Sequence, residues 1–148
     1  MESFTEIVNY AIKMEEDSMR LYQRLASHCQ RAEVKKVFLD MVGQEEGHKK
    51  KLENIKAKGT LPLGKLTVPD EDMHLAEILA DVDADKPDLT YQESLVIGMK
   101  LEKAALSLYR ILAELTETGE AKQLFLYLAD EEARHKHLFE AEFDDLMP

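Results

Sequence analysis

The sequence predicts an all-α protein, an antiparallel four-helix bundle built from two repeated helical hairpins with a long crossover between them. Three observations support this fold class. Apolar residues recur at spacings of three and four along four segments, and only 6 glycines and 4 prolines interrupt the 148 residues. A Glu-x-x-His motif in the second segment also returns 87 positions later in the fourth. A chain of this length is expected to form one domain, over residues 1–148, with a sizeable core.

The first predicted hairpin covers about residues 4–56. Ser3 and Glu6 form a capping-box pattern that begins a helix over about 4–28. A second helix is predicted over about 32–57, and a connection of only a few residues makes the two helices antiparallel neighbours. The inward stripe of this second helix comprises Val34, Val37, Phe38, Met41, Glu45, His48, Leu52 and Ile55.

Residues 59–89 differ in character from the segments on either side, because prolines and glycines break any long element. We expect this stretch to be the crossover that runs the length of the bundle, so that the second and third helices are parallel. A short helix within it, over about 73–82, is expected to lie across the bundle.

The second predicted hairpin covers about residues 91–143. Thr90 and Glu93 form another capping box, which opens a helix over about 91–117, and the last helix covers about 120–145. An ungapped alignment of residues 6–53 with 93–140 pairs 15 identical residues. Because so many identities do not arise by coincidence in two merely similar helices, the hairpins are predicted to be related by a pseudo-two-fold axis.

Four glutamates and two histidines lie on the predicted inward faces of these helices. Glu15, for example, follows Val8 by seven positions and precedes Tyr22 by seven, so it shares their face of the helix. Each Glu-x-x-His motif places its histidine one turn after its glutamate. The six residues are Glu15, Glu45, His48, Glu102, Glu132 and His135.

A two-metal site explains these inward acids better than a plain core does. Burying an unpaired carboxylate costs several kcal/mol, whereas two divalent cations balance four carboxylates and leave two neutral imidazoles as further ligands. The alternative is a bundle whose buried acids pair with lysine or arginine, but the stripes carry no inward basic residue at that level. The predicted cofactor is therefore a pair of divalent metal ions, and the ligand types do not exclude zinc or manganese.

With these residues named, the chain resembles the rubrerythrin family of the ferritin-like superfamily over about residues 4–56 and 91–143. The resemblance implies a ferritin-like bundle that holds two irons. In the family, the matching residues bridge both irons (Glu45 and Glu132), bind one iron each (Glu15 and Glu102) or cap the ends of the pair (His48 and His135).

Two departures from the family bear on the function. Rubrerythrins proper carry a further glutamate one turn after the ligand that matches Glu102, where this chain has Ala105. They also carry a rubredoxin-like domain with four cysteines, whereas this sequence has one cysteine, so electrons are expected from a separate protein. The remaining set of four glutamates and two histidines is similar to the ferroxidase centre of bacterioferritins.

The resemblance implies a non-haem di-iron oxidoreductase that reduces hydrogen peroxide or dioxygen, and so acts against oxidative stress, with electrons from an external donor such as a rubredoxin. One alternative is an iron-binding ferroxidase that handles Fe²⁺ in the manner of a ferritin subunit. A non-redox metal-binding bundle is another. Tyr22 and Tyr109 are expected to orient ligand carboxylates by hydrogen bonds, or else simply to pack in the core.

Composition limits the partners. A net charge of −11 argues against nucleic acid and anionic membranes, which bind basic surfaces. The first residues lack a basic start and an apolar run, so a cytoplasmic location is expected. A homodimer is expected by analogy with the family.

The histidines without a repeat partner, His28, His74 and His137, are expected in loops or at the surface, and Cys29 is expected to be an inert thiol.

Overall fold

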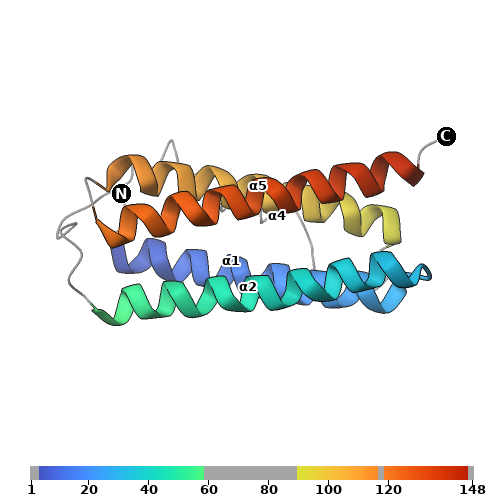
Figure 1. Cartoon of the computed structure of the whole chain (residues 1–148), viewed down its shortest axis with the longest axis horizontal. Helices are drawn as coiled ribbons and strands as arrows, with labels where there is room; N and C mark the ends of the chain where they lie inside the picture. The colour runs from blue at the N-terminus through green and yellow to red at the C-terminus, as the bar shows by residue number, and fades with distance from the viewer. Residues whose placement is uncertain (1–3, 59–89, 117–118, 147–148) are drawn as a thin grey trace.

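The computed structural model describes residues 4–58, 90–116 and 119–146, which form four helices. They are α1 (Phe4–His28), α2 (Ala32–Lys58), α4 (Tyr91–Leu115) and α5 (Glu120–Leu146). The predicted all-α, ferritin-like four-helix bundle is confirmed, and each hairpin is a pair of antiparallel helices (Figure 1). The short helix predicted over about 73–82 lies outside the described residues.

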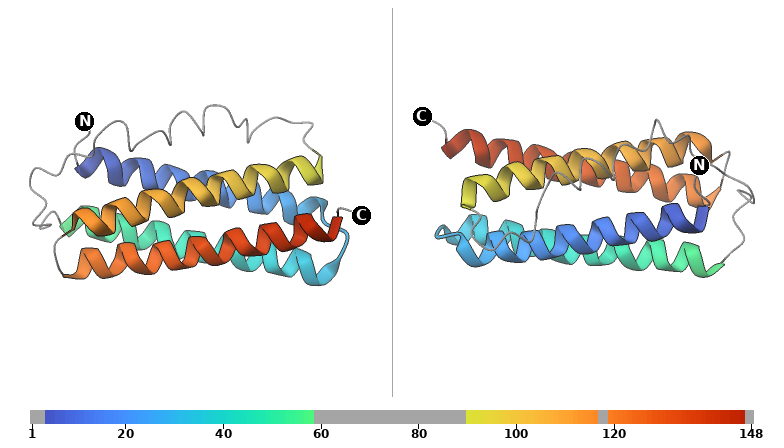
Figure 2. Two further views of the ribbon diagram at one scale, coloured as in Figure 1. Left: turned by 90° about the horizontal axis from the view of Figure 1, so that it is seen from above. Right: turned by 180° about the vertical axis from the view of Figure 1, so that it is seen from behind.

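Within the bundle, α1 packs along α2 and α4 packs along α5. The two hairpins meet mainly through α1 and α4, and to a smaller extent through α2 and α5. The last turn of α2 and the first turn of α4 lie at opposite ends of the bundle, so these two helices run parallel as predicted (Figures 1 and 2). Among the described helices, none is both long and apolar enough to span a membrane.

Two apolar clusters fill the bundle, one on either side of its middle. On α1, the first cluster contains Ile7 and Val8, and the second contains Leu21 and Leu25. The stretch of α1 between them carries the buried Glu15, so the polar centre of the molecule is enclosed by hydrophobic packing at both ends. The prediction that Val37 faces inward is wrong, because its side chain is 37% exposed.

The start of α4 has the capping box that the sequence predicts. The Thr90 hydroxyl accepts a hydrogen bond from the Glu93 backbone N–H at 3.0 Å, and the Glu93 carboxylate accepts one from the Thr90 N–H at 3.2 Å. These bonds satisfy two backbone donors that the first turn of a helix leaves without partners. They therefore fix where α4 begins.

Replacing Thr90 with alanine is expected to lower the free energy of unfolding by about 1 kcal/mol, because a helix N-cap contributes roughly that amount. Chemical denaturation of the purified protein measures the change. Thr90→Ser keeps the hydroxyl acceptor and serves as the matched control. An alanine variant as stable as the serine variant would show that the box does not stabilise α4.

The end of α4 comes at Leu115, two residues before the predicted end. The Thr116 hydroxyl donates to the Leu112 carbonyl at 2.6 Å, and the Lys122 ammonium donates to the carbonyls of Ala113 and Thr116 at 3.0 and 3.2 Å. The Lys122 ammonium thus donates to two carbonyls that would accept backbone N–H groups if α4 continued by another turn. The sequence pattern did not reveal this arrangement, since Lys122 lies on the next helix.

At the opposite end of the bundle, polar side chains join the two hairpins. Glu142 on α5 forms an ion pair with Arg31, which lies between α1 and α2. Tyr91, the first residue of α4, donates a hydrogen bond from its hydroxyl to Glu142 at 3.0 Å. Cys29 lies 3.8 Å from the same hydroxyl and is half-buried. This cluster fixes the relative position of the hairpins at that end.

Candidate metal centre

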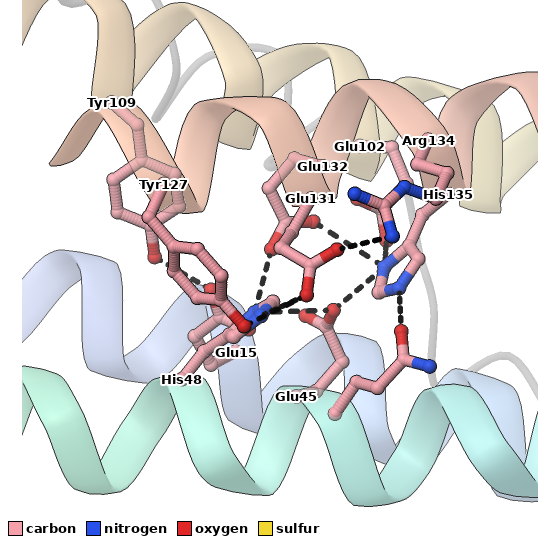
Figure 3. A network of polar contacts seen from close by, with 11 residues as sticks. Glu15, Glu45, His48, Glu102, Tyr109, Tyr127, Glu131, Glu132, Arg134 and His135 are labelled. Carbon is pink, nitrogen blue, oxygen red and sulfur yellow. Dashed lines mark hydrogen bonds and ion pairs between the residues drawn. The ribbon is translucent and has the colours of Figure 1, made fainter. Parts of the chain in front are cut away.

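The structure brings together, at the middle of the bundle, six side chains from four helices. α1 provides Glu15, α2 provides Glu45 and His48, α4 provides Glu102, and α5 provides Glu132 and His135 (Figure 3). None is more than 2% exposed. We call them the six central side chains. They are the residues that the sequence pattern predicts to face one another.

The six central side chains form two overlapping groups. Glu15 and His48 belong to the first group, and Glu102 and His135 belong to the second. Glu45 and Glu132 are common to both, and within each group the ligand atoms lie within 4.8 Å of one another. Glu45 and Glu132 lie between the imidazoles of His48 and His135 in Figure 3. This arrangement has the form of two cation positions that share two carboxylates.

The donor atoms at the centre fit a pair of cations. Buried polar atoms normally have hydrogen-bond partners, yet several oxygens and nitrogens here have none among the described residues. Because the site offers acidic oxygens and imidazole nitrogens but no lysine or arginine, cations of charge two are the natural compensation. The atoms without partners are Glu15 Oε2, Glu45 Oε1, both Glu102 oxygens, Glu132 Oε2, His48 Nε2 and His135 Nδ1.

Both imidazoles direct Nδ1 toward the carboxylates. His48 Nδ1 lies 3.0 Å from Glu132 Oε1 and 3.5 Å from oxygens of Glu15 and Glu45. His135 Nδ1 lies 2.8 Å from Glu45 Oε1 and 3.6 Å from Glu102 Oε1. Each histidine therefore presents the same nitrogen to the centre, and each Nε2 is directed away from it.

Burial and crowding shift the pKa values of the acids in opposite directions. Burial, together with the neighbouring Glu132 carboxylate, raises the pKa of Glu45 and of Glu102 well above the usual value, and raises that of Glu15. Burial also opposes ionisation of Glu132, but its interactions with Glu102 and with both histidines lower its pKa overall. Without a bound cation, negative charge is therefore favoured on Glu132 over its three neighbours.

The imidazoles respond to the same charges. Burial disfavours a charged His48, but the carboxylates of Glu132 and Glu15 outweigh it and raise the pKa of His48 to about 9. The pKa of His135 is also raised, against the effect of burial, by Glu102, Glu132 and Glu45. Positive charge is therefore strongly favoured at this point of the bundle, which is the electrostatic condition for binding a cation.

The two tyrosines of the repeat lie at the centre in different ways. The Tyr109 hydroxyl donates a hydrogen bond to Glu15 Oε1 at 2.6 Å. The Tyr22 hydroxyl has no hydrogen-bond partner among the described residues, and its ring packs edge-on against His135 with a centroid distance of 6.2 Å. Only Tyr109 makes the carboxylate contact that the sequence leads us to expect of both.

Replacing Tyr109 with phenylalanine is expected to weaken metal binding about 10–100-fold, the usual effect of removing a hydrogen-bond partner from a metal ligand. Tyr22→Phe is the matched control and is expected to leave the affinity unchanged. Titration of the metal-free protein with Co²⁺, followed by absorbance, measures both variants. Equal affinities for the two variants would contradict an orienting role for Tyr109.

Sequence reasoning missed a set of polar residues outside the centre. Gln44 Oε1 lies 2.6 Å from His135 Nε2, and Glu131 Oε1 lies 4.0 Å from His48 Nε2. The signal was present in the sequence, because each residue immediately precedes a central glutamate and the two lie 87 positions apart. Glu131 also accepts a hydrogen bond from the Tyr127 hydroxyl at 2.9 Å, and Arg134 Nη1 lies 3.3 Å from its other oxygen.

The residues predicted to lie away from the centre do so where the structure describes them. His28 and His137 are exposed, and His137 Nδ1 lies 3.5 Å from Glu140. Cys29 lies at the end of the bundle, among the residues that join the hairpins. His74 lies outside the described residues.

Comparison with proteins of known structure identifies the same fold elsewhere. A Thermotoga maritima protein, provisionally described as a ferritin-like diiron-carboxylate protein, superposes with a TM-score of 0.77 at 24% identity, over 97% of this chain and 95% of that one. A hypothetical protein from Pyrococcus furiosus gives a TM-score of 0.72 at 23% identity, over 96% of this chain and 89% of that one. At these identities the likeness establishes the fold alone.

Comparison at the level of sequence is more specific. No curated protein matches the chain. The Rubrerythrin family model matches residues 6–89 and 93–148, a span that includes all six central side chains. The chain therefore belongs to the rubrerythrin family.

Proposed function

We propose that this protein is a non-haem di-iron oxidoreductase of rubrerythrin type, which reduces hydrogen peroxide or dioxygen with electrons from an external carrier such as a rubredoxin. The six central side chains are the proposed iron ligands. Glu45 and Glu132 would hold both ions, Glu15 and Glu102 would each hold one, and His48 and His135 would each bind one through Nδ1.

The observation that carries the proposal is the sharing of Glu45 and Glu132 between two groups of buried ligand atoms. A structural core would pair these acids with lysine or arginine, and the described residues place neither among them. Membership of the rubrerythrin family and the ferritin-like fold support iron as the metal. Two bound ferrous ions would supply one electron each, which together with two protons from solvent suits the reduction of hydrogen peroxide to two water molecules.

The protein's own contribution is to position the ligands and exclude water. Glu15 is held by the Tyr109 hydroxyl, and His135 is held by Gln44 through the nitrogen that faces away from the centre. The apolar clusters on either side of the centre separate it from the ends of the bundle. A small oxidant fits such a site more readily than a large organic substrate does, because the central side chains are almost fully buried.

The proposed activity is tested by mixing the protein, loaded with two ferrous ions per chain, with stoichiometric hydrogen peroxide in a stopped-flow spectrometer. We expect oxidation of the bound iron faster than that of free Fe²⁺ under the same conditions, followed by re-reduction when a reduced rubredoxin is added. Oxidation no faster than that of free Fe²⁺ would contradict the proposal.

A ferroxidase of the ferritin type is a second candidate, and one observation favours it. The position one turn after Glu102 is occupied by Ala105, which is 4% exposed, so that turn of α4 provides no additional carboxylate. Mineral storage requires a closed shell of many subunits. Light scattering that gives about two subunits would exclude storage, and a large closed assembly that turns over Fe²⁺ and dioxygen would favour this candidate.

The identity of the metal is a separate question, since zinc and manganese accept the same ligands. Elemental analysis of protein purified without added metal is expected to give about two irons per chain. Stoichiometric zinc in place of iron would favour a non-redox metal-binding bundle. The homodimer, the cytoplasmic location and the role against oxidative stress stay predictions.

A further inference from the structure

The two imidazoles at the centre differ in what holds them from outside. When a histidine binds a cation through Nδ1, its proton is on Nε2, and an acceptor for that proton fixes the ring and makes it a better ligand. The acceptor available to His135 is the amide oxygen of Gln44, at 2.6 Å. The group facing His48 Nε2 is the carboxylate of Glu131, at 4.0 Å.

These acceptors are equivalent in the repeat but not in charge. Gln44 and Glu131 each precede a bridging glutamate, and each faces the imidazole of the other hairpin. A carboxylate accepts a charge-assisted hydrogen bond, which is roughly twice as strong as a bond to a neutral amide. Of the two histidines, only His48 therefore faces a charged acceptor.

Glu131 has two polar partners of its own. Tyr127 donates a hydrogen bond to one oxygen at 2.9 Å, and the Arg134 guanidinium lies 3.3 Å from the other. The corresponding residues of the first hairpin are Asp40 and Gly47, which provide neither a phenol hydroxyl nor a guanidinium. The network around Glu131 therefore has no counterpart beside Gln44 in the repeat.

A second contact also distinguishes the position formed by Glu15 and His48. Tyr109 fixes Glu15, which belongs with His48, at 2.6 Å. Its repeat counterpart, Tyr22, has a buried hydroxyl with no hydrogen-bond partner in the described parts of the chain, and so does not fix Glu102. Glu15 therefore has an outer hydrogen-bond donor that its repeat counterpart Glu102 lacks.

We infer that the two cation positions are unequal: the position formed by Glu15 and His48 binds its cation first and more tightly, and Glu131 is the positioning residue responsible. This rests on the dinuclear site of the proposed function. In the loaded protein the His48 Nε2–H would donate to Glu131, whose Oε1 lies 4.0 Å from Nε2 in this structure.

The test uses Co²⁺ alone, a paramagnetic cation that requires no redox chemistry. Metal-free protein is titrated with Co²⁺ while proton NMR follows the exchangeable Nε2–H signals of the coordinated histidines. We expect one shifted N–H signal to grow up to one equivalent and a second to grow only between one and two equivalents. Gln44→Glu changes the acceptor of His135 only, so the signal that moves in this variant identifies that ring.

Two variants, each of which gives both histidines the same type of acceptor, make the test specific. In Glu131→Gln both acceptors are amides, so the first binding step is expected to weaken about 10–100-fold and the two signals are expected to grow together. In Gln44→Glu both are carboxylates, so the second step is expected to tighten by a similar factor. Glu46→Gln removes one exposed charge of α2, where Glu46 faces Lys50, and is expected to change neither step.

The outcomes separate this inference from the proposed function. Two cobalt ions bound with N–H signals that grow together in the natural protein would overturn the inequality and leave the dinuclear site intact. A first signal that belongs to His135, or a Glu131→Gln variant with unchanged affinities, would overturn it as well. Failure to bind two cobalt ions would contradict the dinuclear site itself, and the inference with it.

Discussion

Glu45→Gln is expected to abolish binding of the second metal ion and to weaken binding of the first. Glu45 belongs to both groups of central ligands, so its loss removes an oxygen from each cation position. The effect should exceed the roughly 10–100-fold loss that follows from removing an outer hydrogen-bond partner. Metal analysis after dialysis against Fe²⁺ or Co²⁺ is expected to fall from two ions per chain to one or fewer.

Unfolding of the variant does not explain such a loss. Glu45 is one of the four central carboxyl groups, which repel one another when ionised, and an amide of the same shape relieves part of this repulsion. The metal-free variant should therefore be at least as stable as the metal-free natural protein. Glu46→Gln, one position along α2 and exposed, is the matched control. If Glu45→Gln retains two ions per chain, the bridging assignment is wrong.

Gly98→Ala is expected to lower the free energy of unfolding by about 1 kcal/mol. A Cβ at this position would lie 2.5 Å from Phe139 Cε1 and 2.6 Å from Cζ, well inside contact distance. Phe139 cannot move away easily, because it is fully buried and packs against Tyr22 and Phe38. Overpacking costs about 1–3 kcal/mol, and the better helix propensity of alanine offsets about 1 kcal/mol of that.

The repeat provides the compensating change. The first hairpin has Ala11 and Leu52 at the positions of Gly98 and Phe139, and both are fully buried in one cluster. Adding Phe139→Leu to Gly98→Ala is therefore expected to restore stability relative to the sum of the single changes. A double-mutant cycle by chemical denaturation should give a coupling of about 1–3 kcal/mol. Simple additivity would show that the ring and the glycine are not in contact.

The fold could be predicted from the sequence because local and long-range signals agree. Apolar spacing gave the helices to within two residues at each end, and Thr90 with Glu93 gave the start of α4. The end of α4 was predicted two residues late, since it depends on Lys122 from the following helix. The predicted stripe of α2 was one position too wide at Val37, which is 37% exposed, whereas the adjacent Phe38 is buried.

The convergence of the six central side chains could also be predicted, because every one lies on an apolar stripe and recurs after 87 positions. The outer residues could not be found in this way. Glu131 and Gln44 differ in type, so they drop out of a comparison that counts identities, and each contacts the opposite hairpin. Tyr22 and Tyr109 are identical in the repeat, yet only one makes a hydrogen bond. Such differences depend on side-chain positions that a periodic pattern does not record.

The central claim is that the six central side chains hold two metal ions. Anomalous diffraction at the iron edge, from crystals of the iron-loaded protein, tests it most directly. We expect two peaks about 3.5–4 Å apart, with Glu45 and Glu132 between them and one imidazole beside each. A single peak at the centre, or iron bound only at the surface acids, would contradict this account of the protein.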